Sequence, residues 1–283
     1  MKVLGLVASP RKLGNSEIIV KEMLQSLPDN WQKEMIRLND LRIDLCRACY
    51  ACLPQGSNCV LPDDLNFFLS RVREADKVII AAPVYYLGQH TTLKLINDRM
   101  IAIQSDSREY FKNKQCVIVI PHTVKDWEGY GREAAMHFAR FLGLNVTGTL
   151  IVNKTLPGDV LDEDSLIKIR KLAASLVDNS TVDFRDPTLA YCPDCGSSLL
   201  QIQRNGRWRC VMCGAVGGWE VKDGEFSMNV TPSAIKRFSR EGMEEHGHTL
   251  TKIKEEYIRR RNEVAANQDI YKEINYWIKL TRP

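Results

Sequence analysis

Strand-like and helix-like patterns alternate over the first two thirds of the chain. Five stretches have the length and apolar content of strands: residues 2–8, 32–38, 77–83, 115–121 and 146–152. Stretches with apolar residues at helical spacing lie between them: residues 16–24, 65–73, 93–99 and 131–142. Because parallel strands are joined by crossover helices and buried on both faces, this alternation predicts an α/β fold with a doubly wound parallel sheet.

The pattern changes after Asp186-Pro187, a turn-forming dipeptide at which we place the linker. Short strand-like segments follow, and from residue 232 the chain is highly charged with helical spacing. Two apolar faces can be traced in this tail: Leu250, Ile253 and Tyr257, then Ile270, Ile274, Trp277 and Ile278. We therefore expect three parts, residues 1–185, 186–230 and 231–283, with the tail covering its own domain or a neighbouring subunit.

Composition limits the function classes. The 283 residues carry 39 basic and 35 acidic side chains, a net charge of +4, which is too balanced to indicate nucleic acid or an anionic membrane. The first apolar run ends at Ser9 after a few residues, and no segment approaches the roughly 20 apolar residues of a membrane helix. These features predict a cytoplasmic protein. Its nine cysteines then indicate metal rather than disulfides, since eight of them fall into two tight clusters.

Residues 9–16 have the features of a phosphate-binding loop. The segment Ser9-Pro10-Arg11-Lys12-Leu13-Gly14-Asn15-Ser16 joins the first predicted strand to a helix with Ser16 as its cap. A helix start after such a turn offers unpaired backbone N–H groups and the positive end of the helix dipole. Side chains of Ser9, Asn15 and Ser16 add donors, and Arg11 adds a charge. The loop therefore fits a phosphomonoester, whereas the alternative is an ordinary strand-to-helix turn.

Other loops are expected at the same edge of the sheet. Ligands of doubly wound folds bind outside the carboxyl ends of the strands. The cysteine loop after the second strand, Pro83-Val84-Tyr85-Tyr86-Leu87-Gly88 after the third and residues 122–129 after the fourth all belong to that edge. No G-x-G-x-x-G fingerprint follows a predicted strand, so a mononucleotide is favoured over a dinucleotide.

Several of these motifs resemble a known family. Ser9-Pro10-Arg11 with Gly14-Asn15-Ser16, Pro83-Val84-Tyr85, and Leu93-Lys94 with Asp98-Arg99 resemble the flavodoxin-like NADPH-dependent FMN reductases. The pattern Cys46-x2-Cys49-x2-Cys52-x6-Cys59 followed by Asp63-Asp64 resembles their iron-sulfur flavoprotein branch. The resemblance covers about residues 1–180. It implies FMN, a [4Fe-4S] cluster on these four cysteines, and a homo-oligomer in which cluster and flavin communicate.

The resemblance also assigns flavin-binding residues. It implies that the FMN phosphate lies on Ser9, Arg11, Asn15 and Ser16, next to Gly14, and that the isoalloxazine ring lies against the segment Pro83, Val84, Tyr85 and Tyr86. No side chain stands out as a general acid or base, so no catalytic residue is predicted beyond the cofactor ligands. The cofactors are expected to supply the redox chemistry, while the protein positions the flavin and limits solvent access.

The spacing of the first cysteine cluster supports a cubane independently. Cysteines at 46, 49 and 52 are too close together to form two separate knuckles, which zinc prefers, and Pro54 with Gly56 allows the bend that brings in Cys59. Three alternatives stay open at this point: a [4Fe-4S] cluster, a zinc or empty site, and redox disulfides. Cys116, alone in an apolar strand, is predicted to be a small core residue.

The second cysteine cluster has the spacing of a four-thiolate zinc ribbon. Cys192 and Cys195 are separated by fourteen residues from Cys210 and Cys213, and Asn205-Gly206 between them predicts a two-residue hairpin turn. A rubredoxin-like iron site is the main rival. Residues 186–230 carry four basic and five acidic side chains, which argues against nucleic acid.

Together these features predict an electron-transfer flavoprotein that passes electrons between FMN and a [4Fe-4S] cluster. Its partner is expected to be a redox protein or a small-molecule acceptor. One alternative is an NAD(P)H-dependent FMN or quinone reductase without a functional cluster. A further alternative is a redox-sensing binding protein that acts through its zinc ribbon.

Overall fold

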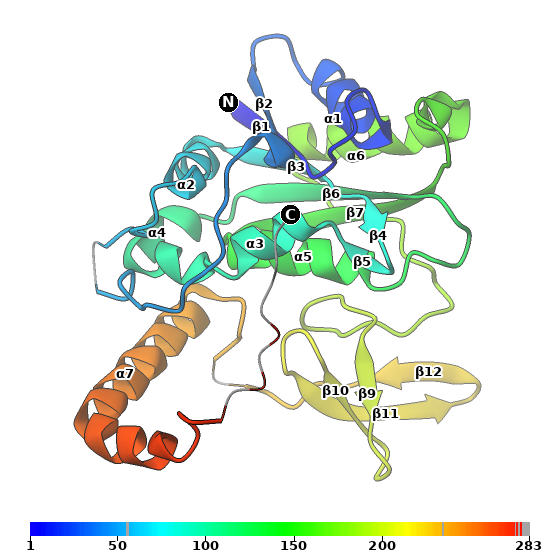
Figure 1. Cartoon of the computed structure of the whole chain (residues 1–283). Coiled ribbons are helices and arrows are strands. Elements are labelled where there is room, and N and C mark those ends of the chain that lie inside the picture. Colours follow the sequence, from blue (N-terminus) through cyan, green and yellow to red (C-terminus); the bar gives the residue numbers. More distant parts are fainter. Residues whose placement is uncertain (55–56, 234, 275, 277, 279–283) are drawn as a thin grey trace.

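A computed structural model describes residues 1–54, 57–233, 235–274, 276 and 278 (Figure 1). Gly56 and Trp277, which the sequence analysis singled out, lie outside the described residues. Within them the chain forms an α/β domain with a parallel sheet, a small antiparallel sheet and a long C-terminal helix. In the described part of the chain, none of the helices combines the length and apolar content that crossing a membrane requires.

The central sheet has six strands in the order β2-β1-β3-β6-β7-β8, all paired in parallel. The strands are β1 (Lys2–Val7), β2 (Gln32–Arg37), β3 (Lys77–Ala81), β6 (Gln115–His122), β7 (Asn145–Asn153) and β8 (Val182–Asp183). The five expected strands are confirmed, and β8 adds an edge that the sequence did not predict. Strand order reverses between β1 and β3, as in flavodoxin-like folds, so ligands are expected beside that point.

Helices cover both faces of this sheet (Figure 1). On one face lie α1 (Asn15–Gln25) and α6 (Glu163–Asp178); on the other lie α2 (Leu65–Glu74), α3 (Thr91–Asn97), α4 (Ser107–Tyr110) and α5 (Gly131–Phe141). Short 3₁₀ turns are η1 (Leu38–Asp40), η2 (Met100–Asp106) and η3 (Asp159–Leu161). Strands β3 and β6 are buried along their whole length, which explains their continuous apolar sequences.

A glycine sets the distance between β1 and α1. A Cβ atom on Gly5 would lie 2.3 Å from Cγ1 of Val20, so only glycine allows α1 to pack this closely on the strand. The close packing places the N-terminus of α1 directly beyond the end of β1. Gly14 occupies the N-cap position and its carbonyl accepts from Glu17 and Ile18. The expected Ser16 cap is therefore wrong, because the N-cap residue lies two positions earlier and Ser16 belongs to the first turn of the helix.

The second sheet is antiparallel, in the order β12-β11-β10-β9. Its strands are β9 (Leu200–Ile202), β10 (Arg207–Cys210), β11 (Val216–Lys222) and β12 (Glu225–Met228). The expected hairpin is present, but its turn has three residues, 204–206, because Gln203 N–H bonds to the Arg207 carbonyl. Gly206 takes φ +76°, the left-handed position that closes such a three-residue turn.

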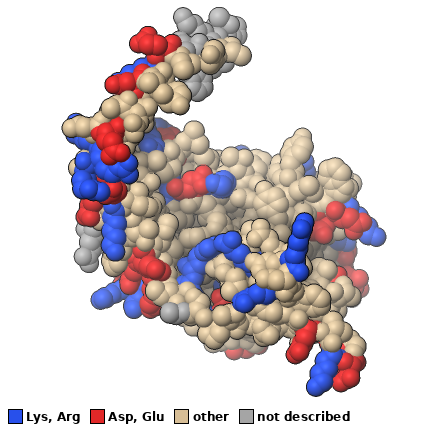
Figure 2. Space-filling model, turned by 90° about the horizontal axis from the view of Figure 1, so that it is seen from below, with Lys and Arg blue, Asp and Glu red and all other residues tan. Residues whose placement is uncertain are grey.

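Helix α7 (Arg240–Asp269) projects from the body of the molecule (Figures 1 and 2). Its first turns contact η2 and α4, and Met243 is its one buried residue within the described chain. Ile253 and Tyr257 are 54% and 60% exposed. The first turns of the tail thus cover their own domain, as expected. The outer turns do not, and for them the alternative, that they cover a neighbouring subunit, stays a prediction.

Candidate functional site

One pocket of about 310 Å³ lies at the carboxyl edge of the sheet, beside the reversal of strand order. It gathers all nine residues that the sequence assigned to the flavin: Ser9, Arg11, Gly14, Asn15, Ser16, Pro83, Val84, Tyr85 and Tyr86. The remaining lining residues come from the end of β6 and the loops after β6 and β7: Pro121, His122, Thr123, Trp127, Lys154, Thr155 and Pro157. The volume falls within the range of small-ligand and cofactor sites.

The loop after β1 forms one end of this pocket. Ser9 and Ser16 are buried, whereas Arg11 is exposed at the rim. In the first turn of α1 the N–H groups of Asn15 and Ser16 have no intrahelical acceptor. Leu13 takes φ +53°, which turns the chain sharply enough to face these groups toward the pocket. The arrangement provides backbone donors, hydroxyl groups and one guanidinium for an anion.

Arg37, the last residue of β2, holds this loop in place. Its guanidinium donates to the carbonyl oxygens of Ser9 (3.3 Å) and Arg11 (2.9 Å), and to Glu17 Oε2 (2.5 Å). Glu17 also accepts from Leu13 N–H at 2.7 Å. Hydrogen bonds from Lys21 first, and then from Arg37 and Leu13, outweigh the cost of burial and lower the pKa of Glu17 to about 2. An ionised carboxylate thus fixes the turn that presents the anion site.

Asn15 links this loop to the segment after β7. Its amide nitrogen donates to the Lys154 carbonyl at 3.4 Å, and its amide oxygen accepts from Gly158 N–H at 2.9 Å. Gly158 takes φ +94°, a conformation that glycine adopts without strain. Asn15 therefore has a bridging role between two loops of the pocket.

The other end of the pocket is a small hairpin, where the sequence analysis expected an irregular loop. Strands β4 (Val84–Tyr85) and β5 (Gly88–Gln89) pair, and the two turn residues, Tyr86 and Leu87, take φ +45° and +67°. Both residues lie in the left-handed region, which is costly for bulky side chains and is found most often at functional sites. Tyr86 is 98% exposed at the tip.

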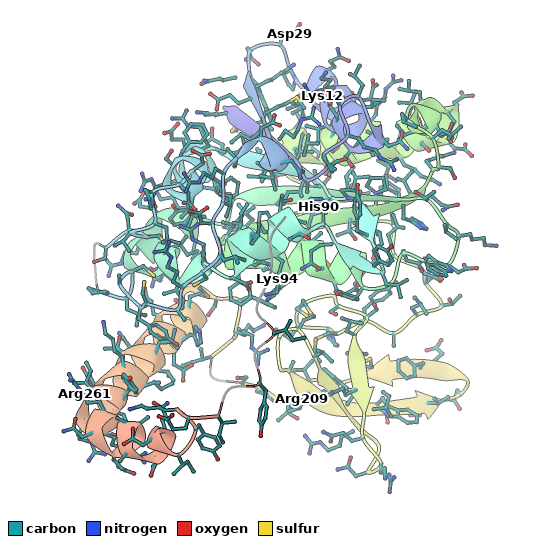
Figure 3. The ribbon with its side chains drawn as sticks, in the orientation of Figure 1. Lys12, Asp29, His90, Lys94, Arg209 and Arg261 are labelled. Atoms are coloured by element: carbon teal, nitrogen blue, oxygen red, sulfur yellow. The ribbon has the colours of Figure 1, made fainter. Side chains whose placement is uncertain are left out.

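The hairpin rests on the start of α5. Tyr130 N–H donates to the Leu87 carbonyl at 2.8 Å, and a Cβ on Gly88 would lie 2.6 Å from the Tyr130 hydroxyl. Tyr85 contacts His90 edge-on, with ring centroids 4.9 Å apart, at the beginning of α3 (Figure 3). These contacts position the aromatic side of the pocket without occupying it.

The first cysteine loop lies apart from the pocket, which none of its described cysteines lines. The chain leaves β2 and runs past α3 toward α4, on the other side of α3 from the β4–β5 hairpin (Figure 1). Cys46 and Cys49 are exposed, whereas Cys52 and Cys59 pack against the core. The expectation that this loop shares the sheet edge with the pocket is therefore wrong, because the segment after η1 folds over the α2–α4 layer.

Cys52 lies close enough to the other three cysteines of this loop to be affected by their charges. Burial raises the pKa of Cys52, and the charges of Cys59, Cys49 and Cys46 raise it further. Among the described residues they do not form a closed ligand set such as the one in the second sheet. Four neighbouring thiols whose ionised forms repel one another form a donor set that a cationic centre would stabilise.

A buried ion pair lies beneath this loop. Arg99 and Asp63 have side chains that are 1% and 0% exposed, and Arg99 Nη2 donates to Asp63 Oδ1 at 3.0 Å. Burial opposes ionisation of Asp63, but hydrogen bonds from Arg99 and from the N–H groups of Asp44 and Leu65 outweigh it and lower its pKa. The neighbouring Asp98 pairs with Lys94.

Cys192, Cys195, Cys210 and Cys213 form the second cysteine site. All four are buried and their sulfur atoms lie within 4.8 Å of one another. Cys192 and Cys213 are 3.6 Å apart, and Cys195 and Cys210 are 3.5 Å apart. These four side chains lie close enough together to hold a metal ion. Trp208, fully buried, packs against it.

Two arginines of α5 fasten this site to the sheet domain. Arg132 donates to the Gly196 carbonyl at 3.1 Å, and Arg140 donates to the Cys195 carbonyl at 2.9 Å. Glu133 Oε1 accepts from the N–H and hydroxyl of Ser198. Since α5 begins beside the β4–β5 hairpin, the cysteine site and the pocket share one supporting helix.

Several contributors to the pocket and its frame were not predicted from the sequence. Arg37 and Lys154 belong to strand ends that meet the loop after β1 only in the folded sheet. His122 and Trp127 lie in a segment assigned to this edge, but neither was singled out. Their positions in the sequence could have indicated them, because each of these residues ends or follows a parallel strand at the edge of the sheet where ligands bind.

The fold and this pocket define a flavodoxin-like protein with a mononucleotide-type site. A family model described as NADPH-dependent FMN reductase matches residues 1–155. The chain belongs to this family of oxidoreductases.

Similar proteins show to which group within this family the chain belongs. An iron-sulfur flavoprotein of Archaeoglobus fulgidus is 31% identical over 184 residues, which cover 63% of this chain and 80% of the relative. Iron-sulfur flavoprotein MJ1083 of Methanocaldococcus jannaschii is 36% identical over 100 residues, or 35% of this chain and about half (51%) of the relative. The chain is thus a flavin-dependent oxidoreductase of the iron-sulfur flavoprotein group.

A solved structure extends the likeness to the whole chain. A flavone reductase covers 100% of both chains with a TM-score of 0.74 at 18% identity. At this identity the likeness concerns the fold alone. It includes the second sheet and the long helix, which lie beyond the residues that the family model matches.

Proposed function

We propose that this protein binds FMN in the pocket and passes electrons between the flavin and a [4Fe-4S] cluster on Cys46, Cys49, Cys52 and Cys59. The observation that carries the proposal is the single pocket in which an anion-binding helix start faces an aromatic hairpin. A redox protein or a small-molecule acceptor then receives or supplies the electrons.

The residues of the pocket fit FMN. The N–H groups at the start of α1, with Ser9, Ser16 and Arg11, would hold the phosphate. The hairpin with Tyr85 and Tyr86 would support the ring, whose electron exchange in one- or two-electron steps is the chemistry that the flavin supplies when bound. The hydrogen bonds of Arg37 and Asn15 hold the phosphate end of the pocket in place.

The four thiols of the first cysteine loop fit an iron-sulfur cluster in kind and spacing. Besides burial, the charges of the other three cysteines raise the pKa of Cys52, and a bound cationic centre would offset this effect. Since no described cysteine of the loop lines the flavin pocket of its own chain, we propose a homo-oligomer in which the cluster of one subunit approaches the flavin of another. Electron exchange between cluster and flavin requires the two to lie close together, and the homo-oligomer would meet this requirement.

We propose that the second cysteine site holds one zinc ion. Four sulfurs at about 2.3 Å from a tetrahedral ion lie roughly 3.8 Å apart. The two closest pairs here are 3.5 and 3.6 Å apart, which supports a mononuclear centre over a cubane. Iron in the same geometry is the rival. Zinc does not change its redox state, so the site would be structural.

Spectroscopy with metal analysis on anaerobically purified protein tests the proposal. We expect flavin bands, broad absorbance near 400 nm that bleaches with dithionite, about four irons and one zinc per chain, and loss of the iron in a Cys49→Ser variant. Iron near zero with flavin present would instead support the second candidate, an NAD(P)H-dependent FMN or quinone reductase. The open arrangement of the loop's sulfurs is the observation that favours that candidate.

A further inference from the structure

Arg99 makes a contact with a cysteine of the first loop that the proposed function does not explain. Its Nη2 lies 3.0 Å from Cys59 Sγ and is placed to donate to it. Arg99 follows α3, forty residues beyond Cys59, so the contact is a product of the fold. The Arg99 side chain is 1% exposed, so competition from water is limited on the donor side of this hydrogen bond, while Cys59 is half-buried.

The same guanidinium joins both ends of the cysteine loop. Arg99 Nη1 donates to the carbonyl of Asp44, two residues before Cys46, at 3.2 Å. Both terminal nitrogens reach Asp63, four residues after Cys59, and Asp63 in turn accepts from Asp44 N–H at 2.7 Å. The planar fork of arginine suits this arrangement, because it supplies several donors in fixed directions.

From this geometry we infer that Arg99 sets the reduction potential of the centre bound by Cys59. The inference rests on the proposed function, since it requires the cluster. A one-electron reduction of the cluster adds one negative charge to a centre that already carries thiolate ligands. A buried hydrogen-bond donor with a positive charge at one of these sulfurs stabilises the reduced form more than the oxidised form.

Asp63 reduces this effect without cancelling it. Its oxygen atoms reach the guanidinium and two backbone N–H groups, whereas the contact with Cys59 Sγ is made by Arg99. The carboxylate thus acts on Arg99, keeping it charged and oriented, while Arg99 acts on the sulfur. Arg99 is therefore a positioning and tuning residue rather than a catalytic one.

The test compares midpoint potentials of the cluster in anaerobic redox titrations followed by electron paramagnetic resonance. The main variant is Arg99→Met with Asp63→Asn, which removes the donor without leaving a charge buried alone. We expect at least a tenfold lower ratio of reduced to oxidised cluster at a fixed potential, equal to a negative shift of about 59 mV for one electron. Arg99→Lys retains a positive donor without the fork, and its potential should lie between the two.

A matched control is Lys94→Met with Asp98→Asn, which removes an exposed ion pair on the preceding turn of the same segment (Figure 3). Its potential should equal that of the wild type. If the double variant binds too little cluster to be titrated, the midpoint potential of Arg99→Lys alone tests the inference. A wild-type midpoint potential in either variant that binds the cluster overturns the role of Arg99. A wild-type chain without iron and sulfide overturns the proposed function, and this inference with it.

Discussion

At the scale of single residues, Arg11 and Lys12 offer a direct comparison. Both are exposed cations of the loop after β1. Arg11 lines the pocket, whereas Lys12, labelled in Figure 3, is not among its lining residues. Arg11→Ala should weaken FMN binding by about 1.5 to 3 kcal/mol, roughly 10- to 150-fold in Kd, because a charge-assisted hydrogen bond is lost. Flavin fluorescence titration measures this. Lys12→Ala is the control, and equal Kd values for both variants would place the anion elsewhere.

Glu17 makes the stability of the protein depend on pH in the acid range. Because its folded pKa is lowered to about 2, its contribution to stability is complete above about pH 4.5 and is lost as pH falls toward 2. On the order of 2 kcal/mol should be lost between pH 5 and pH 3. Urea unfolding at the two pH values should therefore show a smaller loss in Glu17→Gln than in the wild type.

Asp29, exposed on the turn before β2, provides the control for this measurement (Figure 3). Asp29→Asn removes a carboxylate of the same domain without touching the loop. Its acid-induced loss should equal that of the wild type. An unchanged loss in Glu17→Gln would mean that Arg37 and Leu13 do not hold an ionised carboxylate.

At the scale of elements, helix α7 has two parts: its first turns pack against the body of the protein, and its later turns are exposed. Met243 is 3% exposed and packs at the junction with η2, whereas Tyr257 is 60% exposed. Met243→Ala should cost about 2 to 5 kcal/mol in the free energy of unfolding, since it leaves a cavity. Tyr257→Ala should change it by about 0.5 kcal/mol or less. If Tyr257→Ala lowered the free energy of unfolding of the monomeric protein as much as Met243→Ala does, the outer turns of α7 would also pack against the body of the protein.

The ribbon formed by residues 192–228 is expected to depend on its metal. Cys210→Ser should lower the zinc content below one per chain and shift Trp208 emission to the red, because this fully buried indole packs on the cysteines. FMN affinity should stay within about twofold, since none of the four cysteines lines the pocket. Val211→Ala, at an exposed neighbour, is the control; an unchanged zinc content in Cys210→Ser would contradict the site.

At the scale of the whole molecule, local pattern predicted most of the architecture. The buried runs 77–83 and 115–121 became β3 and β6, and the loop 9–16 became one wall of the pocket. These features depend on neighbours in sequence. Cys116 is buried in β6 as expected, and burial raises its pKa.

The sequence could not provide what depends on distant neighbours. Arg37 braces the loop after β1 only because β1 and β2 pair in register, Val7 beside Arg37. Arg99 reaches Cys59 only because the cysteine loop folds over α3. The predicted course of the cysteine loop was wrong for the same reason. The order of strands along the chain predicts the sheet edge at which a loop begins, but it does not predict the layer on which the loop packs.

The left-handed turn at Tyr86 and Leu87 has a consequence for the variation that this molecule can tolerate. Glycine at position 86 would relieve about 1 to 2 kcal/mol of backbone strain, yet it would remove the aromatic side chain from the pocket. Substitutions selected for thermostability alone should therefore accumulate at this turn and reduce flavin retention. The hairpin tip is thus a point at which stability and function are selected in opposite directions.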